Sequence, residues 1–385
     1  MDHIIDLLHD AEDALRNCCL VSKSLIPRTR KHLFAEVKFP TEKRLDSWKG
    51  TFPDPSTSPA HYARTLSIGH PRVIRAAEGG WLRGFSCVVH LTVGPGLHTG
   101  ASVTSLIPLH GFSPVIRSLR LHYTILRSSY AFGLILSFPL LENVAVIVHR
   151  RSIDNREISQ RLSAFFQPQI LPRFTGSLEL CCQGGMKLIA RRLLSLTGGL
   201  HFREFTSTWF EEGDVLLTTA LVGMCSHTLE SLEVTCKLGM PTQHLHPHQQ
   251  LTSVPAKLKL VSADLSKAIK LKDVIFRLES RTVEWITVAL QTITPKHRDL
   301  HQISIYVPYS LILIGSDDNA RLAFGEEVFG QWLDLDRLLV QLRESCSLHP
   351  RVVCAELTWE TRGLRDCIEC LLPETAKRGM IHQSD

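Results

Sequence analysis

"LESLEVTC" at residues 229–236 alternates apolar and polar side chains: Leu232 and Val234 alternate with Glu233 and Thr235. Successive side chains of a strand point to opposite faces, so this alternation predicts a strand with one buried and one solvated face. "VIRSLRLHY" at residues 115–123 has the same pattern. The fold is decided by how often this pattern returns.

Strand-like segments recur along the chain past residue 60. Most of them begin about 25–30 residues after the previous one, with longer gaps near 240–270 and 310–350. Helix-like stretches lie between them, for example at 186–196, 214–230 and 282–293. One strand and one helix cannot bury their apolar faces alone, so stacked strand-helix units are expected. The predicted strands are 65–68, 88–93, 118–123, 143–149, 177–182, 203–209, 231–237, 272–278, 302–307 and 352–357.

The two opening stretches resemble the leucine-rich-repeat line L-x-x-L-x-L, with Cys236 loosely at the position of the Asn or Cys that follows it. This resemblance implies an α/β fold in which residues 63–385 form a leucine-rich-repeat-like solenoid. A doubly wound α/β sheet uses the same alternation of strands and helices and is the alternative fold.

Composition places the chain among globular proteins, with 44% hydrophobic and 21% charged residues. Its 385 residues exceed the usual size of one domain, but a repeat array can grow past that size because each unit packs only on its neighbours. The net charge of +5 comes from 43 basic and 38 acidic side chains spread along the chain. Nucleic-acid binding usually requires clustered Lys and Arg, so no nucleic-acid partner is expected.

The eleven cysteines are an odd number in a chain without a secretory-type N-terminal segment. They predict reduced thiols in a cytoplasmic or nuclear protein. The most apolar stretch, "YAFGLILSFPLL" at 130–141, is interrupted by Pro139 and is shorter than the roughly 20 residues of a membrane-spanning helix. No membrane partner is expected.

Residues 1–39 predict three short helices. Asp13 is the expected N-cap of the second helix, and Pro27 suits the first turn of the third. Three short helices bury little surface by themselves, so the segment needs a partner or the array that follows. The residues expected to face inward are Ile4, Ile5 and Leu8 in the first helix and Leu15, Cys18, Cys19 and Val21 in the second.

Residues 40–62 carry four prolines and several Ser and Thr. This composition predicts a linker or an irregular first turn of the array. The segment 237–257, which interrupts the period of the strands, is a predicted surface insertion.

"HIIDLLHDAEDALRNCCLVSKSLIPRTRKHLF" at 3–34 resembles the F-box, in particular that of the F-box proteins of mushroom-forming fungi, which runs close to IIDxLHDDxxALRxCxLVSKSWxPxxRxHLF. "LLPETAKRGMI" at 371–381 also resembles the C-terminal end of that group, whose middle is a degenerate leucine-rich-repeat-like array. The family's box begins with a Leu-Pro pair that does not precede Ile4, and it has Trp where this chain has Leu25. Residues 1–39 are therefore expected to be an N-terminally truncated box.

In that family the box docks on the Skp adaptor of a cullin-based ubiquitin ligase, and the array holds the substrate. The resemblance implies a non-catalytic substrate-receptor subunit whose partners are a Skp-type adaptor, a cullin through that adaptor, and an unknown protein substrate. The alternative is a repeat scaffold without ligase docking, in which the N-terminal apolar residues pack against the first repeat. The residues that the resemblance places at the adaptor contact are Ile4, Ile5, Leu8, Leu15, Leu20, Val21 and Leu25.

No pattern in the sequence predicts a catalytic, cofactor or metal site. The glycines of segment 94–100 are one residue too widely spaced for a dinucleotide fingerprint. The histidines of segment 244–248 have no paired cysteines to complete a four-ligand zinc site. Cys367 and Cys370 fall on an expected amphipathic helix, where packing is the simpler role. The chain is expected to bind no cofactor or metal and not to be an enzyme; a pocket lined by His and acidic residues would instead indicate an α/β enzyme.

Overall fold

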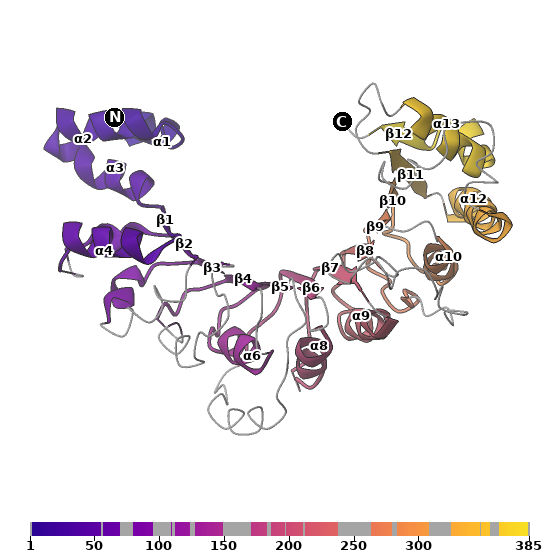
Figure 1. Ribbon diagram of the computed structural model, residues 1–385, viewed down its shortest axis with the longest axis horizontal. Coiled ribbons are helices and arrows are strands. Elements are labelled where there is room, and N and C mark those ends of the chain that lie inside the picture. Colours follow the sequence, from indigo (N-terminus) through magenta and orange to yellow (C-terminus); the bar gives the residue numbers. More distant parts are fainter. Residues whose placement is uncertain are drawn as a thin grey trace, which may run out of the picture. The chain divides into compact units, whose positions relative to one another are not determined.

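The computed structural model forms two compact units, Met1–Phe174 and Thr175–Asp385. Within each unit parallel strands follow one another in chain order, and the longer helices between them lie on one side of the strands (Figure 1). The structure describes residues 2–54, 57–69, 80–94, 109, 112–123, 128–148, 171–182, 186–196, 198–210, 212–237, 263–278, 283–307, 325–346, 348–354 and 362–383.

The described part of the first unit contains five strands, each paired in parallel with the strand before it in the chain. In a doubly wound sheet the strand order reverses at a switch point, whereas here it does not. The solenoid prediction is therefore confirmed over the alternative fold. The strands are β1 (Glu36–Phe39), β2 (Thr65–Ile68), β3 (His90–Val93), β4 (Ser118–Tyr123) and β5 (Asn143–Val148).

Apolar side chains on one face of these strands form the core of the first unit. Val37, Leu66 and Leu91 are aligned across β1, β2 and β3. Leu119 and Val144 continue the same row on β4 and β5. All five side chains are buried, and for the four on β2 to β5 this is the outcome that the alternating pattern predicted.

The helices of the first unit precede or connect its strands. α4 and α6 lie on one side of the strands, and α1 to α3 precede β1 (Figure 1). The elements are α1 (Asp2–Leu7), α2 (Glu12–Val21), η1 (Lys23–Leu25), α3 (Ile26–Leu33), α4 (Glu42–Thr51), η2 (Pro59–Tyr62), η4 (Trp81–Phe85) and α6 (Ser128–Leu136).

Residues 40–62, for which a linker or an irregular first turn of the array was predicted, contain two helical elements. Ten of them form α4, which buries Leu45, and η2 begins with Pro59. β1 already pairs with β2, so the parallel strands begin at Glu36, within the predicted helical segment 1–39. Pro40 and Pro53 lie on either side of α4.

The described part of the second unit contains seven strands, again paired in parallel in chain order. The strands are β6 (Ser177–Cys182), β7 (Glu204–Trp209), β8 (Ser231–Cys236), β9 (Asp273–Leu278), β10 (Gln302–Val307), β11 (His349–Cys354) and β12 (Ile381–Gln383). The helices are α8 (Met186–Leu194), α9 (Glu212–Met224), α10 (Glu284–Gln291), α12 (Glu326–Cys346), α13 (Arg362–Leu371) and α14 (Pro373–Lys377).

Trp209 at the end of β7 lies in the centre of this second core. Its ring centroid is 5.0 Å from that of Trp285 in α10, and its Nε1–H donates to Thr218 Oγ1 of α9 at 2.9 Å. Ser207, also on the buried face of β7, forms a second hydrogen bond with the Thr218 hydroxyl at 2.9 Å. One buried hydroxyl thus satisfies two polar groups that the strand carries into the core.

All ten strands predicted past residue 60 are present, and β11 is the one that is displaced, beginning at His349 and not at residue 352. The predicted helices at 186–196, 214–230 and 282–293 correspond to α8, α9 and α10. β1 and β12 were not predicted.

Candidate functional site

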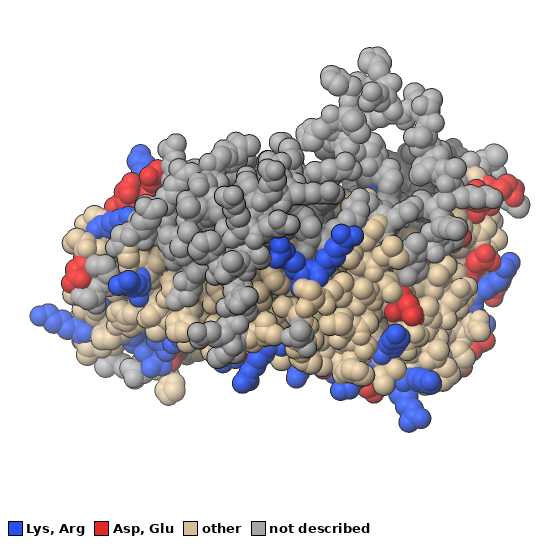
Figure 2. All heavy atoms as spheres, turned by 90° about the horizontal axis from the view of Figure 1, so that it is seen from below, with Lys and Arg blue, Asp and Glu red and all other residues tan. Residues whose placement is uncertain are grey.

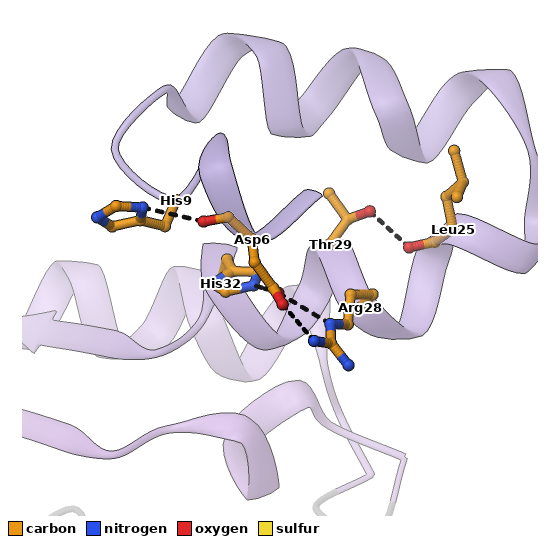
Figure 3. Close-up of polar contacts among 6 residues, drawn as sticks. All are labelled: Asp6, His9, Leu25, Arg28, Thr29 and His32. Atoms are coloured by element: carbon orange, nitrogen blue, oxygen red, sulfur yellow. Dashed lines mark hydrogen bonds and ion pairs between the residues drawn. The ribbon is translucent and has the colours of Figure 1, made fainter. Parts of the chain in front are cut away.

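The carboxylate of Asp6 joins the first helix of the N-terminal segment to the third. Asp6 Oδ1 accepts from Arg28 Nε at 2.9 Å and contacts His32 Nε2 at 2.8 Å, and Arg28 also pairs with the second oxygen, Oδ2 (Figure 3). The bidentate arrangement fixes the direction of the carboxylate as well as its distance from α3. α1 is therefore held in one place on α3.

The same contacts hold the pKa of Asp6 well below its usual value of 3.8. The hydrogen bonds from Arg28 make the largest contribution to lowering the pKa, and the contact with His32 comes next. Both partners stabilise the charged carboxylate more than the protonated acid. Asp6 is therefore ionised at neutral pH.

The N-terminal helices continue into the array without a break in packing. α1 and α2 both pack on α3, and α3 also contacts η2. Phe34, directly after α3, lies edge-on to Trp48 of α4 at 5.8 Å between ring centroids, and Trp48 lies 5.7 Å from Phe39 of β1. Within α3, Thr29 is buried and its hydroxyl donates to the carbonyl of Leu25 at 2.5 Å (Figure 3). Aromatic contacts thus connect the helical segment to the first repeat.

The predicted adaptor-contact residues divide into two groups by burial. Ile5 and Leu15 are only 3% and 1% exposed, so they pack between the helices in this structure. The side chain of Ile4 lies outside the described part of the chain. The remaining positions are Leu8 and Leu25, which are half-buried, and Leu20 and Val21, which are exposed.

Val21 does not face inward as the apolar pattern of α2 suggested, because it is 80% exposed. Each residue of an α-helix advances by about 100°, so Val21 is rotated by about a third of a turn from the direction of Leu15. Cys18 and Cys19, three and four residues after Leu15, are the half-buried neighbours on the inner face. The predicted N-cap also differs, since α2 begins after Ala11 and Asp13 lies in its first turn.

The most exposed large apolar side chains of the described residues lie in the first two helices. Leu20 is 85% exposed, and Val21 and Leu7 are each 80% exposed. Outside the N-terminal helices, Leu216 of α9 is exposed by 58% and Ile269 by 44%. Leu7 was not among the predicted contact residues, because the sequence pattern placed only Ile4, Ile5 and Leu8 on the apolar face of α1.

A second surface lies on the solvated face of the strands in the second unit. Arg277 of β9 aligns with Tyr306 of β10, and its Cζ lies 4.4 Å from the centroid of the Tyr306 ring. Arg277 Nε also donates to Glu233 Oε1 of β8. The Arg277 guanidinium of β9 is thus stacked on Tyr306 of β10 and bonded to the Glu233 carboxylate of β8.

Ion pairs also join the residues that directly precede the strands. Lys272 Nζ lies 2.6 Å from Glu230 Oε2, and Arg203 Nε lies 4.0 Å from Glu230 Oε1. The hydrogen bond from Lys272 is the main cause that lowers the pKa of Glu230 below its usual value. In the first unit Arg117 and Glu142 form the equivalent pair at 2.7 Å. The pairs recur at the same position of neighbouring repeats, just before the strand. Because they are exposed to solvent, each contributes little to stability.

The part of the chain that the structure describes contains no group of three or more His, Cys, Asp or Glu able to hold a metal. Cys367 and Cys370 lie on α13, where burial is the main cause that raises the pKa of the Cys367 thiol. The histidines of 244–248 and most of the glycine-containing segment 94–100 lie outside the described residues.

Lys and Arg side chains on the face drawn in Figure 2 lie singly or in small groups, several of them beside Asp or Glu. Among the described helices, none has the length and apolar character needed to cross a membrane.

No family model matches this chain, and no curated protein sequence matches it significantly. A solved structure with similarity is that of the leucine-rich repeat-containing protein LegL7 from Legionella pneumophila. The two chains share 9% sequence identity, and the match covers 83% of this chain and 96% of that one with a TM-score of 0.36. The fold assignment rests on the consecutive parallel strand order and not on this similarity.

Proposed function

We propose that this chain is a non-catalytic substrate-receptor subunit of a Skp-cullin-F-box ubiquitin ligase. The N-terminal helices would dock on a Skp-type adaptor, which connects them to a cullin, and the array would bind a protein substrate. The sequence resemblance of residues 3–34 to the F-box of fungal F-box proteins supports this assignment. Such a subunit acts in the cytoplasm or nucleus by raising the effective concentration of the substrate near the transferred ubiquitin.

The observation that carries the proposal is the exposure of Leu20 and Val21, two adjacent apolar side chains at the end of α2. Burying a side chain of this size contributes about 1.5–3 kcal/mol, so the pair could supply a large part of a docking free energy. α2, the helix that presents the pair, packs on α3 and buries Leu15. A partner would therefore meet an ordered surface, with little entropy lost on binding.

The test is binding of the purified full chain to a Skp-type adaptor, measured by titration calorimetry. Replacing both Leu20 and Val21 by Glu should weaken adaptor binding at least tenfold, because two charges would be forced into an apolar interface. Leu216→Glu, at an exposed leucine of α9, is the matched control and should leave adaptor binding unchanged. Unchanged adaptor binding by the doubly substituted chain would contradict the proposal.

A gain of binding provides a second arm of the test. Leu25→Trp restores the aromatic residue that the family's box has at this position, and aromatic anchors often dominate interface energetics. We expect Leu25→Trp to tighten adaptor binding several-fold.

A repeat scaffold without ligase docking is the second candidate, and the packing of Phe34 against Trp48 favours it because that contact joins the helices to their own array. Absence of adaptor binding by both the natural chain and Leu25→Trp, with the array folded, would select the scaffold.

A further inference from the structure

Charged side chains divide along the solvated face of the second unit. β6, β7 and β8 present Glu179, Glu204 and Glu233 on this face. β9 presents Arg277 as well as Asp273, and β11 presents Arg351, on the same face as Tyr306 of β10. The cationic side chains therefore gather at β9–β11.

Arg277 contacts side chains of both neighbouring strands. Its guanidinium lies over the Tyr306 ring, and its Nε–H donates a hydrogen bond to Glu233. Its two terminal nitrogens form no hydrogen bond with any of the described residues, and 45% of its side chain is exposed. With the ring stacked and Nε already bonded, the two terminal nitrogens of the guanidinium remain. Their N–H groups point away from Nε and have the spacing of the two oxygens of a carboxylate.

The strand register places further residues on the same face as this guanidinium. Arg351 is aligned with Ser304 of β10, and Ser304 is aligned with Ile275 of β9. Neighbouring strands lie about 4.8 Å apart, so Ile275 and Arg351 face the same surface from about 10 Å apart, with the small Ser304 between them. Arg351 is exposed and forms no ion pair with a described residue. The surface thus combines an aliphatic side chain, an aromatic ring and two arginines.

We propose that the face of β9–β11 formed by Ile275, Arg277, Tyr306 and Arg351 binds an acidic peptide segment, with one Asp or Glu carboxylate on the terminal nitrogens of Arg277. This inference deepens the proposed function and rests on it, because the acidic segment would belong to the protein substrate that the array holds. A second carboxylate of the segment would meet Arg351, and an apolar side chain beside the first carboxylate would lie over Ile275.

The charge balance of the same face favours a peptide over a nucleic acid. Glu233 and Asp273 lie on the face beside the two arginines, and Asp273 Oδ1 is 3.5 Å from His301 Nε2. A phosphate backbone carries a charge on every nucleotide and would be repelled by these carboxylates. A peptide can instead place one or two carboxylates where the arginines are and neutral residues elsewhere.

The test uses a fluorescein-labelled octapeptide, Gly-Glu-Leu-Glu-Glu-Leu-Glu-Gly, and its counterpart with every Glu replaced by Gln. Binding of each to the full chain is measured by fluorescence anisotropy. We expect the Glu peptide to bind at least tenfold more tightly than the Gln peptide. Arg277→Gln should remove most of this difference, and Tyr306→Leu should reduce it several-fold because the guanidinium would lose its stacking partner.

Arg337→Gln is the charge-matched control, since Arg337 is a highly exposed arginine of α12 and pairs there with Asp334. It should leave both peptide affinities unchanged. Equal affinities for the two peptides, or the same loss in Arg337→Gln as in Arg277→Gln, would overturn the inference. The outcome is separable from adaptor docking: adaptor binding without acidic-peptide binding sinks only this inference, and the reverse result sinks only the ligase assignment.

Discussion

The buried carboxylate of Asp336 in α12 accepts a hydrogen bond from the backbone N–H of Thr375 in α14, at 2.8 Å. Its other oxygen accepts from the backbone N–H of Glu374 at 2.9 Å. A single side chain, 39 residues earlier in the chain, thus caps the first turn of the last helix.

Replacing Asp336 by Ala should destabilise the C-terminal part of the second unit by about 2–3 kcal/mol, because two backbone donors would lose a charged acceptor. Asp336→Asn retains one acceptor oxygen and should cost less. Hydrogen exchange of the amides of Glu374 and Thr375 measures the effect locally. Asp334→Ala, at an exposed position of the same helix, is the control, and equal losses in both variants would contradict the capping role.

Leu15 and Leu20 lie on the same helix, but their truncation should change the stability of the fold by very different amounts. Leu15→Ala removes a side chain that is 1% exposed and should cost about 2–5 kcal/mol. Leu20→Ala truncates a side chain that is 85% exposed and should change stability by less than about 0.5 kcal/mol. Thermal unfolding of the two variants checks both values. Adaptor binding should be weakened by Leu20→Ala although the fold is intact.

The ion pairs of Asp6 predict a pH-dependent attachment of α1. The folded state lowers the pKa of Asp6, so the pairing stabilises the folded state at pH values above the usual value of 3.8. This contribution is lost as the pH falls below 3.8 towards the depressed pKa, because the carboxylate must then take up a proton. Hydrogen exchange of the α1 amides between about pH 7 and pH 2 should show the loss of protection.

Asp6→Asn should make the exchange of α1 faster at neutral pH and remove most of the acid dependence. Asp10→Asn is the matched control, since Asp10 is 89% exposed and its contact is with the neighbouring His9. An acid dependence that survives in Asp6→Asn would show that another group is responsible.

The strands were predictable because local alternation is enough to specify them. In β8 the inward positions Leu232, Val234 and Cys236 are all buried, as alternation requires. β1 was missed because it has only four residues and directly follows a helical segment. β11 was displaced because Pro350, which usually interrupts a strand, lies inside it.

The candidate surfaces were less predictable, because they depend on contacts between distant residues. The exposure of Val21 follows from helical rotation and could have been obtained from the sequence. The contact of Arg277 with Glu233 spans 44 residues and crosses the interruption in the period near 240–270. Without the strand register, nothing in the sequence aligns Arg277 with Tyr306.

Substitution of Thr218 tests how much its hydroxyl, which bonds both Ser207 and Trp209, contributes to the stability of the second unit. Thr218→Val keeps the shape of the side chain and removes the hydroxyl that bonds Ser207 and the indole of Trp209. Two buried polar groups would then lack this partner, and the expected cost is about 1–3 kcal/mol in chemical unfolding. Ser207→Ala in the Thr218→Val background should recover part of the loss, because it removes one of the two groups left unsatisfied.

Two glycines of the first unit should respond in opposite directions to a methyl group. A Cβ on Gly69, directly after β2, would lie 2.9 Å from the Cα of Pro40, which is a backbone atom that cannot turn aside. Gly69→Ala must therefore push β1 and β2 apart at this end and should be clearly destabilising. A Cβ on Gly50, in the last turn of α4, would meet nothing within 4 Å.

Gly50→Ala should therefore stabilise the first unit by about 0.5–1 kcal/mol, because alanine lowers the backbone entropy of the unfolded chain and has the higher helix propensity. Thermal unfolding of the two single variants measures both effects against the same natural chain. Equal shifts in the two variants would mean that the approach of Gly69 to Pro40 does not constrain the packing of the first repeat. Opposite shifts would place that constraint at the junction between the N-terminal helices and the array, where β1 first joins the sheet.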